Sequence, residues 1–242
     1  MRFEREAAVV TTLSSPHVVR ILEVSSREAE LPYLAMERLT GGDLSAVLER
    51  RIRLSPSEAA DLAIQVAQGL EEARARGVVH RDIKPKNLFQ TQEGLWKILD
   101  FGIASLAGDP IATSRDELAG TPAYMAPEQI DETIASDHRI DVHALAAVLY
   151  RALTGRTPFS GGDRIRTLHH VLHELPVRPS RHAEVPRAVE DVLLIGLAKR
   201  PADRFDSALE LARALRAAAE GTHDDGLTAR ASELARRQPW SG

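Results

Sequence analysis

One short segment limits the possible folds and chemistry more than any other part of the sequence. It reads His80-Arg81-Asp82-Ile83-Lys84-Pro85-Lys86-Asn87 and places a carboxylate, an ammonium and an amide within six residues, directly after a predicted helix. Thirteen residues beyond Asn87 comes Asp100-Phe101-Gly102, which follows an apolar strand. The Asn87 amide oxygen and the Asp100 carboxylate are hard oxygen ligands, suited to Mg²⁺ that carries phosphate groups. Asp82 is then free to orient and deprotonate a hydroxyl, and Lys84 to neutralise charge on a transferring phosphoryl group.

The composition is that of a folded globular chain without cysteine. The 242 residues contain 31 Lys+Arg against 35 Asp+Glu, a formal net charge of −4, and 43% of them are hydrophobic, which argues against disorder. This charge gives no reason to expect binding to nucleic acid or to an anionic membrane surface. The lack of cysteine excludes disulfides and Cys-ligated metal centres. No apolar run reaches about 18 residues and no signal-peptide pattern is present, so we expect a cytoplasmic protein with no membrane span in this chain.

Apolar periodicity and turn residues predict a mostly helical chain with a short extended region near its start. Ser55, Pro56 and Glu58 form a capping-box pattern that opens a long helix, and Gly77 ends it. Further helices are expected at 2–13, 44–51, 139–154, 163–174, 187–199 and 206–219, and strands at 18–24, 31–39, 88–90 and 96–99. Residues 220–242 are expected to form a polar tail or linker.

In this order and spacing the two motifs resemble those of the protein kinase superfamily. The chain is similar to the bacterial serine/threonine kinases of eukaryotic type from residue 2 to about 219. His80–Asn87 resembles the catalytic loop and Asp100–Gly102 the metal-binding D-F-G segment. A third motif, Gly120-Thr121-Pro122-Ala123-Tyr124-Met125-Ala126-Pro127-Glu128, is similar to the end of the activation segment. The resemblance implies an α+β, protein-kinase-like fold that binds ATP and Mg²⁺ and phosphorylates Ser/Thr hydroxyls of proteins.

The resemblance also implies roles for individual residues. The expected catalytic residues are Asp82, Lys84, Asn87 and Asp100, of which Asn87 and Asp100 would hold Mg²⁺. The hinge would be Met36-Glu37-Arg38-Leu39, whose backbone would meet the adenine edge. The residues expected at the ATP site are Glu37, Leu39, Asp43, Lys84, Asn87, Phe89 and Asp100, with Asp43 near the ribose and Phe89 under the adenine.

Other residues would support or regulate this site. By resemblance, Glu128 would form a buried ion pair with Arg204, and Asp141 would accept hydrogen bonds from the catalytic-loop backbone. Lys84 together with Thr121 is the serine/threonine pattern. Arg81 before the catalytic aspartate is typical of kinases that a phosphate on the activation segment switches on, since a guanidinium binds phosphate bidentately. Thr113, seven residues before Gly120, is the expected phosphorylation site.

The sequence departs from the family pattern at its start. A kinase of this type uses a Gly-rich loop over the phosphates and a third-strand lysine that joins the C-helix glutamate to them. Glu6 matches that glutamate, but Met1 lies only five residues before it, so neither feature has room in this chain. We therefore expect a truncated small lobe at 1–39 and a large lobe at 40–219. Losing even one such donor typically lowers the rate by about 100- to 1,000-fold.

The sequence leaves three functions open. They are a serine/threonine kinase whose chain begins late here, a pseudokinase or regulatory binding module, and a small-molecule phosphotransferase of the aminoglycoside-kinase type. The third is weak, because such enzymes lack the segment Ala126-Pro127-Glu128. The kinase is favoured because all four expected catalytic residues are present.

Three histidines, His169, His170 and His173, stand apart from these motifs. They include an i,i+4 pair of the kind that can hold a metal ion. Related kinases often carry histidine-rich sequence after the same helix. The sequence alone therefore favours ordinary surface histidines over a metal site.

Overall fold

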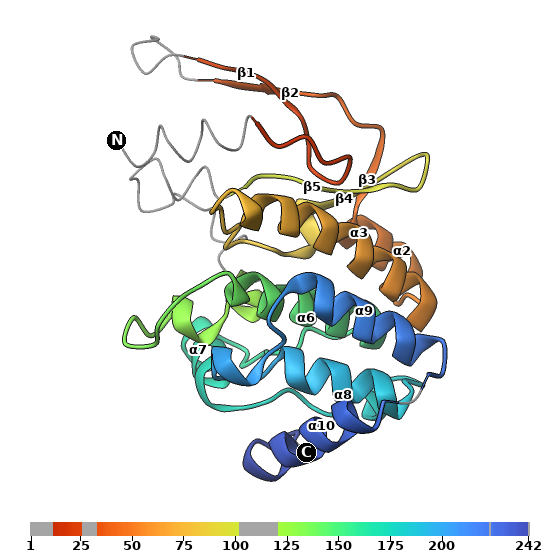
Figure 1. The fold of residues 1–242 in the computed structure, drawn as a ribbon, viewed down its shortest axis with the longest axis vertical. Helices are drawn as coiled ribbons and strands as arrows, with labels where there is room; N and C mark the ends of the chain where they lie inside the picture. Colours follow the sequence, from red (N-terminus) through yellow and green to blue (C-terminus); the bar gives the residue numbers. More distant parts are fainter. Residues whose placement is uncertain (1–11, 26–32, 102–120, 223, 242) are drawn as a thin grey trace.

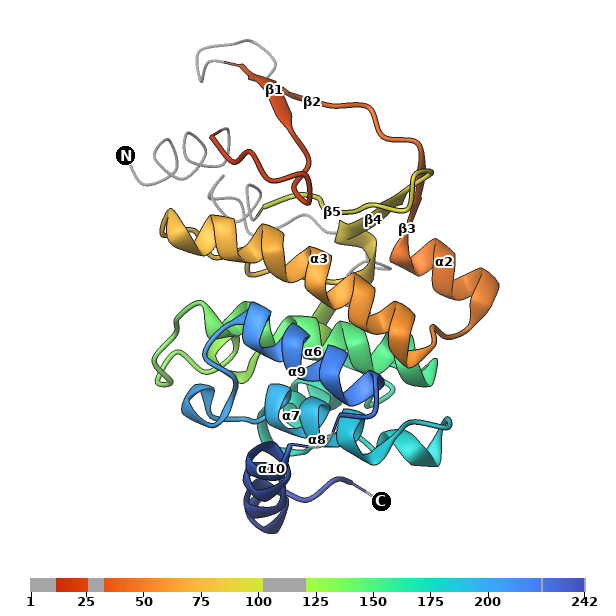
Figure 2. The same cartoon turned by 45° about the vertical axis from the view of Figure 1, so that its right-hand side comes forward.

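The computed structural model of the protein describes residues 12–25, 33–101, 121–222 and 224–241. Figures 1 and 2 show the strands at one end of the molecule and a stack of helices below them, with the C-terminal helix outermost. The expected α+β fold with a mostly helical large lobe is confirmed. None of the helices in the described residues has the length and apolar character needed to cross a membrane.

The small lobe contains an antiparallel hairpin of β1 (Ile21–Val24) and β2 (Leu34–Met36). The expected strand at 18–24 is divided in two, since Val18 and Val19 leave the hairpin and pair with the strand end at Ile98 instead. The Val19 N–H donates to the Ile98 carbonyl at 2.9 Å. Residues 17–19 therefore join the small lobe to the sheet beneath it.

The second sheet has the order β3–β4–β5, formed by Gly41–Asp43, Leu88–Thr91 and Trp96–Ile98. Both pairings are antiparallel, and Asp43 faces Phe89 across the first of them. Gly41 has φ of +143°, and a Cβ atom there would lie 2.0 Å from the Gln90 carbonyl oxygen. Only glycine can occupy that position, so the hinge exit lies directly against β4.

The two helices that follow begin at side-chain caps. Asp43 caps α2 (Leu44–Arg51) by accepting a hydrogen bond from the Ala46 N–H at 2.9 Å. Ser55 and Glu58 form the predicted capping box of α3 (Pro56–Ala75), so the bounds of this helix are confirmed to within a residue or two. The apolar face of α3 packs against α9 and α6, which carry the core of the large lobe.

The core of the large lobe is built around α6 (Arg139–Thr154), which is buried along almost its whole length. Around it lie α7 (Arg164–His173), α8 (Arg187–Gly196) and α9 (Ala208–Ala219). Gly196 permits the close approach of α8 to α6, since a Cβ atom there would lie 2.7 Å from the Ala146 Cβ. Short 3-10 turns link the helices: η1 (Pro85–Asn87), η2 (Thr121–Tyr124), η3 (Pro127–Gln129), η4 (Pro179–Arg181) and η5 (Pro201–Asp203).

The residues expected to form a polar tail form a helix instead, α10 (Asp225–Arg237), which packs on α8. The buried side chains of α10 are Ala231 and Leu234. Two such residues make only a weak apolar pattern, so the sequence did not predict that this segment packs against the large lobe. The guanidinium of Arg230 adds polar anchoring by donating to the carbonyl of Arg204 at 2.5 Å and lying 5.3 Å from the Phe205 ring centroid. The compact lobe therefore continues beyond residue 219.

A partly buried lysine lies beside this part of the core. The Nζ atom of Lys199 donates to the carbonyls of His170 and Val171, at 3.2 and 2.7 Å, and lies 4.2 Å from the Phe159 ring centroid. Burial, together with the nearby Arg204 guanidinium, lowers the pKa of Lys199 to about 7. The folded lobe therefore holds the ammonium less readily than the unfolded chain does.

This difference predicts a pH-dependent stability. In the unfolded chain a lysine stays protonated up to about pH 10.4, so between about pH 7 and 10 the unfolded state binds more protons and the free energy of unfolding rises with pH. We expect thermal denaturation to show Tm increasing from about pH 7 to pH 9 in the native protein. Lys199→Met, which keeps the apolar stem without the ammonium, should flatten that rise. An equal rise in both proteins would contradict the assignment.

Candidate active site

A buried carboxylate at the start of α6 holds the loop that carries the candidate catalytic residues. Asp141 accepts the backbone N–H groups of His80 and Arg81, both at 2.8 Å. Burial raises the pKa of Asp141, against the opposing effect of His80 and of the two N–H donors. The arrangement is the one implied by resemblance, and it anchors the loop to the most buried helix of the lobe.

Three of the expected catalytic side chains lie together. The Lys84 Nζ is 2.8 Å from Asp82 Oδ2, and the Asn87 amide nitrogen donates to the same oxygen at 3.0 Å and to the Asp82 carbonyl at 2.9 Å. Both hydrogens of the Asn87 amide are thereby engaged, so the oxygen of this buried side chain is its remaining group for a cation. The turn η1, with Pro85 at its first position, sets the three residues in this arrangement.

The end of β5 brings Asp100 to the same place. The Leu99 N–H donates to the Asn87 carbonyl at 2.8 Å, and the Leu99 carbonyl lies 2.9 Å from His80 Nε2. Because His80 Nδ1 accepts the Asp82 N–H at 3.2 Å, Nε2 carries the proton and donates to Leu99. Asp100 follows directly and is exposed.

Two residues of the site adopt the left-handed region of backbone conformation. Arg81 has φ of +66° and Asp100 has φ of +48°. Aspartate tolerates this region better than most residues, whereas arginine rarely adopts it. At Arg81 the N–H bond to Asp141 and a bond from the Gln129 amide to the Arg81 carbonyl, at 2.8 Å, hold the conformation.

The expected ATP-binding residues lie on the hinge and on the β3–β4 pair. In the described part of the chain, no backbone N–H donates to the Glu37 carbonyl and no backbone carbonyl accepts the Leu39 N–H. Both groups are therefore available to a ligand. One oxygen of Asp43 is used to cap α2, and Phe89 is half-buried on β4. Asp43 and Phe89 thus lie opposite each other on β3 and β4, and β4 is the strand that follows the loop bearing Asp82, Lys84 and Asn87.

Sequence reasoning missed one residue of the hinge region, Lys97. Its Nζ lies 2.7 Å from Glu37 Oε1, which also accepts the Arg20 N–H at 2.9 Å. Partial burial would raise the pKa of Glu37, but the bonds from Lys97 and Arg20 outweigh it and the pKa lies below its ordinary value. The ion pair ties the hinge to β5, the strand that leads to Asp100.

The segment Ala126-Pro127-Glu128 is held in place by a fully buried ion pair. Arg204 Nη1 and Nη2 donate to the two carboxylate oxygens of Glu128 at 2.5 and 2.8 Å, and both side chains are inaccessible to solvent. Arg204 also donates to the carbonyls of Ala198, Arg139 and Lys199. This bidentate pair connects the turn η3 to the loop before α9.

Two of the expected regulatory residues, Glu6 and Thr113, lie outside the residues that the structure describes. Thr121 begins η2. The rings of His80 and Phe101 are in contact, with centroids 4.6 Å apart.

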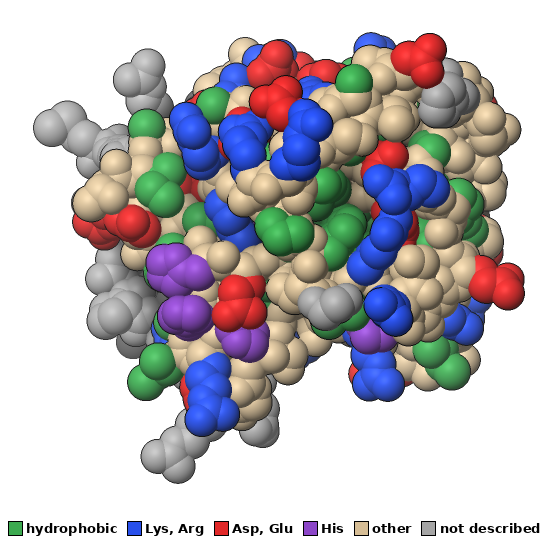
Figure 3. Space-filling view, turned by 90° about the horizontal axis from the view of Figure 1, so that it is seen from below, with side chains coloured by type: hydrophobic (Ala, Val, Ile, Leu, Met, Phe, Trp, Pro, Cys, Tyr) green, Lys and Arg blue, Asp and Glu red, His purple; other side chains and the backbone are tan. Residues whose placement is uncertain are grey.

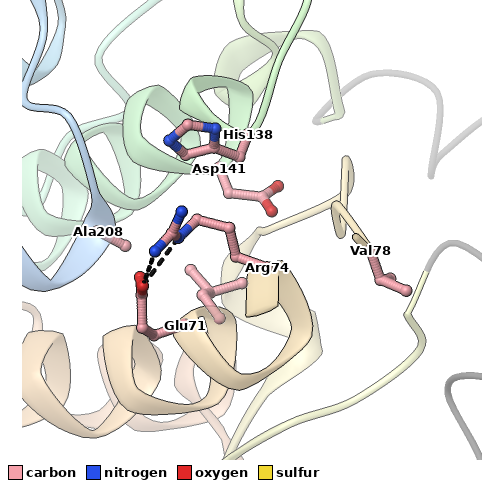
Figure 4. A pocket seen from close by; sticks show the side chains of 7 residues that line it. Glu71, Arg74, Val78, His138, Asp141 and Ala208 are labelled. Atoms are coloured by element: carbon pink, nitrogen blue, oxygen red, sulfur yellow. Dashed lines mark hydrogen bonds and ion pairs between the residues drawn. The ribbon is translucent and has the colours of Figure 1, made fainter. Parts of the chain in front are cut away.

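A small pocket lies on the α3 side of the Asp141 anchor (Figure 4). Its lining residues are Leu70, Glu71, Arg74, Val78, His138, Asp141 and Ala208. Glu71 and Arg74 form an ion pair at its edge. The lining contains none of the residues expected at the ATP site, so this pocket is not the place where ATP is expected to bind.

The chain matches known proteins over most of its length. Residues 1–214 match the family model described as the protein kinase domain. The chain is 42% identical over 224 residues to the serine/threonine-protein kinase PkaA of Streptomyces coelicolor, covering 91% of this chain and 40% of the relative. It is 35% identical over 237 residues to PknE of Mycobacterium tuberculosis, covering 98% and 41%, and 37% identical over 215 residues to PknH of Mycobacterium bovis, covering 88% and 36%. The chain thus spans about two fifths of the length of these curated relatives.

Proposed function

The chain belongs to the protein kinase family, and from this premise we propose that it transfers the γ-phosphoryl group of ATP to serine or threonine hydroxyls of proteins. The resemblance seen in the sequence motifs agrees with the family match. The observation that carries the proposal is the joined set of Asp82, Lys84 and Asn87, with Asp100 held beside it by the Leu99–Asn87 bond.

Each member of this set has a role that its contacts support. The Asp82 carboxylate accepts the proton of the substrate hydroxyl. The hydroxyl oxygen of the substrate forms a bond to the γ-phosphorus of ATP while the bond from that phosphorus to the β–γ bridging oxygen breaks. The Lys84 ammonium, which forms an ion pair with Asp82 Oδ2, stabilises negative charge on the phosphoryl group during its transfer. Because the Asp82 carboxylate and the Lys84 ammonium are already in contact, little reorganisation is needed during the transfer.

Asn87 and Asp100 fit a magnesium ion. The Asn87 oxygen remains free once both amide hydrogens are engaged, and Asp100 adds an exposed carboxylate, which makes a pair of hard oxygen donors. Bound Mg²⁺ supplies charge neutralisation at the phosphate oxygens.

For ATP itself we infer contacts at the hinge. The free Glu37 carbonyl and Leu39 N–H match the donor and acceptor on an adenine edge, Phe89 lies on the neighbouring strand β4, and the second oxygen of Asp43 remains for the ribose. The Glu37–Lys97 ion pair supports this role by holding the hinge against β5.

The substrate class and the control of the enzyme rest on residues of the loop and the segment after it. Lys84 and Thr121 favour a serine or threonine hydroxyl in a protein. We infer that Arg81 receives a phosphate on Thr113, because the exposed guanidinium is not needed to hold its own backbone. A purely regulatory binding module is less well supported, since all four expected catalytic residues are present and the relatives are named serine/threonine-protein kinases.

The proposal is tested by incubating the intact protein and a mixture of candidate proteins with γ-labelled ATP. We expect label on phosphoserine or phosphothreonine. Transfer should fall to background when EDTA removes magnesium, because protein groups alone then have to neutralise the phosphate charge, and it should recover when Mg²⁺ is restored. Transfer that persists in EDTA would contradict the roles of Asn87 and Asp100. Label found only on small molecules would contradict the substrate class.

A further inference from the structure

The C-terminal end of α7 gathers side chains that the proposed reaction does not use. The His169 Nδ1 lies 3.7 Å from Glu174 Oε1, and the His170 Nε2 lies 3.9 Å from the same oxygen. The three atoms all lie within 4.8 Å of one another. Figure 3 shows histidine side chains gathered around an acidic one on the side of the molecule where Figure 1 places α7. One carboxylate oxygen is therefore shared between two imidazoles at the surface.

We propose that this cluster, His169, His170 and Glu174, binds a late first-row divalent cation, with Zn²⁺ as the reference ion. Two imidazole nitrogens and a carboxylate are a donor set that zinc accepts, with zinc–ligand distances of about 2.0–2.2 Å. Donors around a tetrahedral ion at that distance are separated by about 3.3 Å. The side chains of His169 and Glu174 are 60% and 46% exposed, so small rotations suffice to close the remaining gap.

The backbone beneath the cluster is held in place. Lys199 Nζ donates to the carbonyls of His170 and Val171, which fixes the last turn of α7 from the core side. Glu174 is the residue at which the helix ends, and its N–H donates to the His170 carbonyl at 2.9 Å. Ligands on a rigid element keep their spacing, and the negative end of a helix favours a cation.

A fourth position is available to a water molecule or to His173. The ring centroids of His169 and His173 lie 4.8 Å apart, one helical turn from each other. Because α7 packs against η2, where Thr121 begins the end of the activation segment, a bound ion would brace the helix that supports this segment.

The site is tested by titrating the metal-free intact protein with ZnCl₂ in a calorimeter near pH 7.5 and counting bound ions by native mass spectrometry. We expect one Zn²⁺ per chain with micromolar affinity. His170→Ala and Glu174→Gln should each weaken binding by more than about tenfold, since loss of a single metal-supporting group already costs that much. His182→Ala removes an exposed histidine outside the cluster and should bind Zn²⁺ like the native protein.

The histidines and Glu174 would form ion pairs instead of a metal site if the imidazoles were protonated. Titrations with Zn²⁺ at two pH values distinguish the metal site from the ion pairs. A metal requires neutral imidazoles, so repeating the titration near pH 5.5 should abolish binding. Equal affinity in His170→Ala and His182→Ala, or no saturable binding of one ion per chain, would overturn the proposal. Circular dichroism of each variant checks that the fold is retained.

Discussion

Asp82→Asn is expected to lower phosphoryl transfer by about 100- to 10,000-fold while leaving the fold intact, because an amide keeps the shape of the carboxylate but cannot accept the substrate proton. The asparagine oxygen can still receive the bonds that Lys84 and Asn87 now make to Asp82 Oδ2. The loss should therefore appear in kcat rather than in the affinity for ATP. The measurement is the initial rate of label transfer from γ-labelled ATP in the intact protein.

Asp61→Asn is the matched control for this variant. Asp61 is exposed, and its ion-pair partner among the described residues is Arg216 at the surface, a contact worth at most about 1 kcal/mol. It should leave the transfer rate unchanged. If Asp82→Asn keeps the native rate, Asp82 is not the base and the roles inferred for this loop are wrong.

The second large effect concerns stability. Arg204→Ala leaves the buried Glu128 carboxylate without its partner and removes the donor from three backbone carbonyls. Breaking a buried pair from one side costs about 3–5 kcal/mol. For a domain of this size that corresponds to a fall in Tm of roughly 6–20 °C, measured by calorimetry or circular dichroism.

Arg236→Ala provides the comparison, since Arg236 is an exposed arginine on α10. Its Tm should stay within about 2 °C of the native value. If Arg204→Ala does not fold at all, Arg204→Lys keeps the charge but loses the bidentate geometry, and it should give an intermediate Tm. Similar small shifts for Arg204 and Arg236 variants would refute the importance of the pair.

The parts of this fold that could be predicted are those set by local pattern. The capping box at Ser55 and the apolar periodicity that follows it locate α3, because both signals come from residues within one helix. The close grouping of Asp82, Lys84 and Asn87 likewise follows from a single turn. The pairing of Glu128 with Arg204, 76 residues apart, was implied only by resemblance to a family.

The parts that could not be predicted depend on partners distant in the chain. Nothing in the strand pattern around Val18 shows that it will pair with Ile98 rather than continue the hairpin. Lys97 and Glu37, 60 residues apart, carry no sequence signal of their contact. Helix α10 was not predicted because only two of its side chains, Ala231 and Leu234, are buried, and because the carbonyl that Arg230 contacts belongs to Arg204, 26 residues earlier in the chain.

The left-handed backbone at Arg81 and Asp100 also limits which replacements can be interpreted. A β-branched residue at either position would have to leave that conformation, so its effect on activity would report a displaced loop and say nothing of the lost side chain. Asparagine and glycine enter the same region at low cost, so these replacements change the chemistry of the side chain while keeping the shape of the backbone. A substitution at either of these two positions therefore has to meet two requirements, the chemistry of the side chain and the path of the backbone.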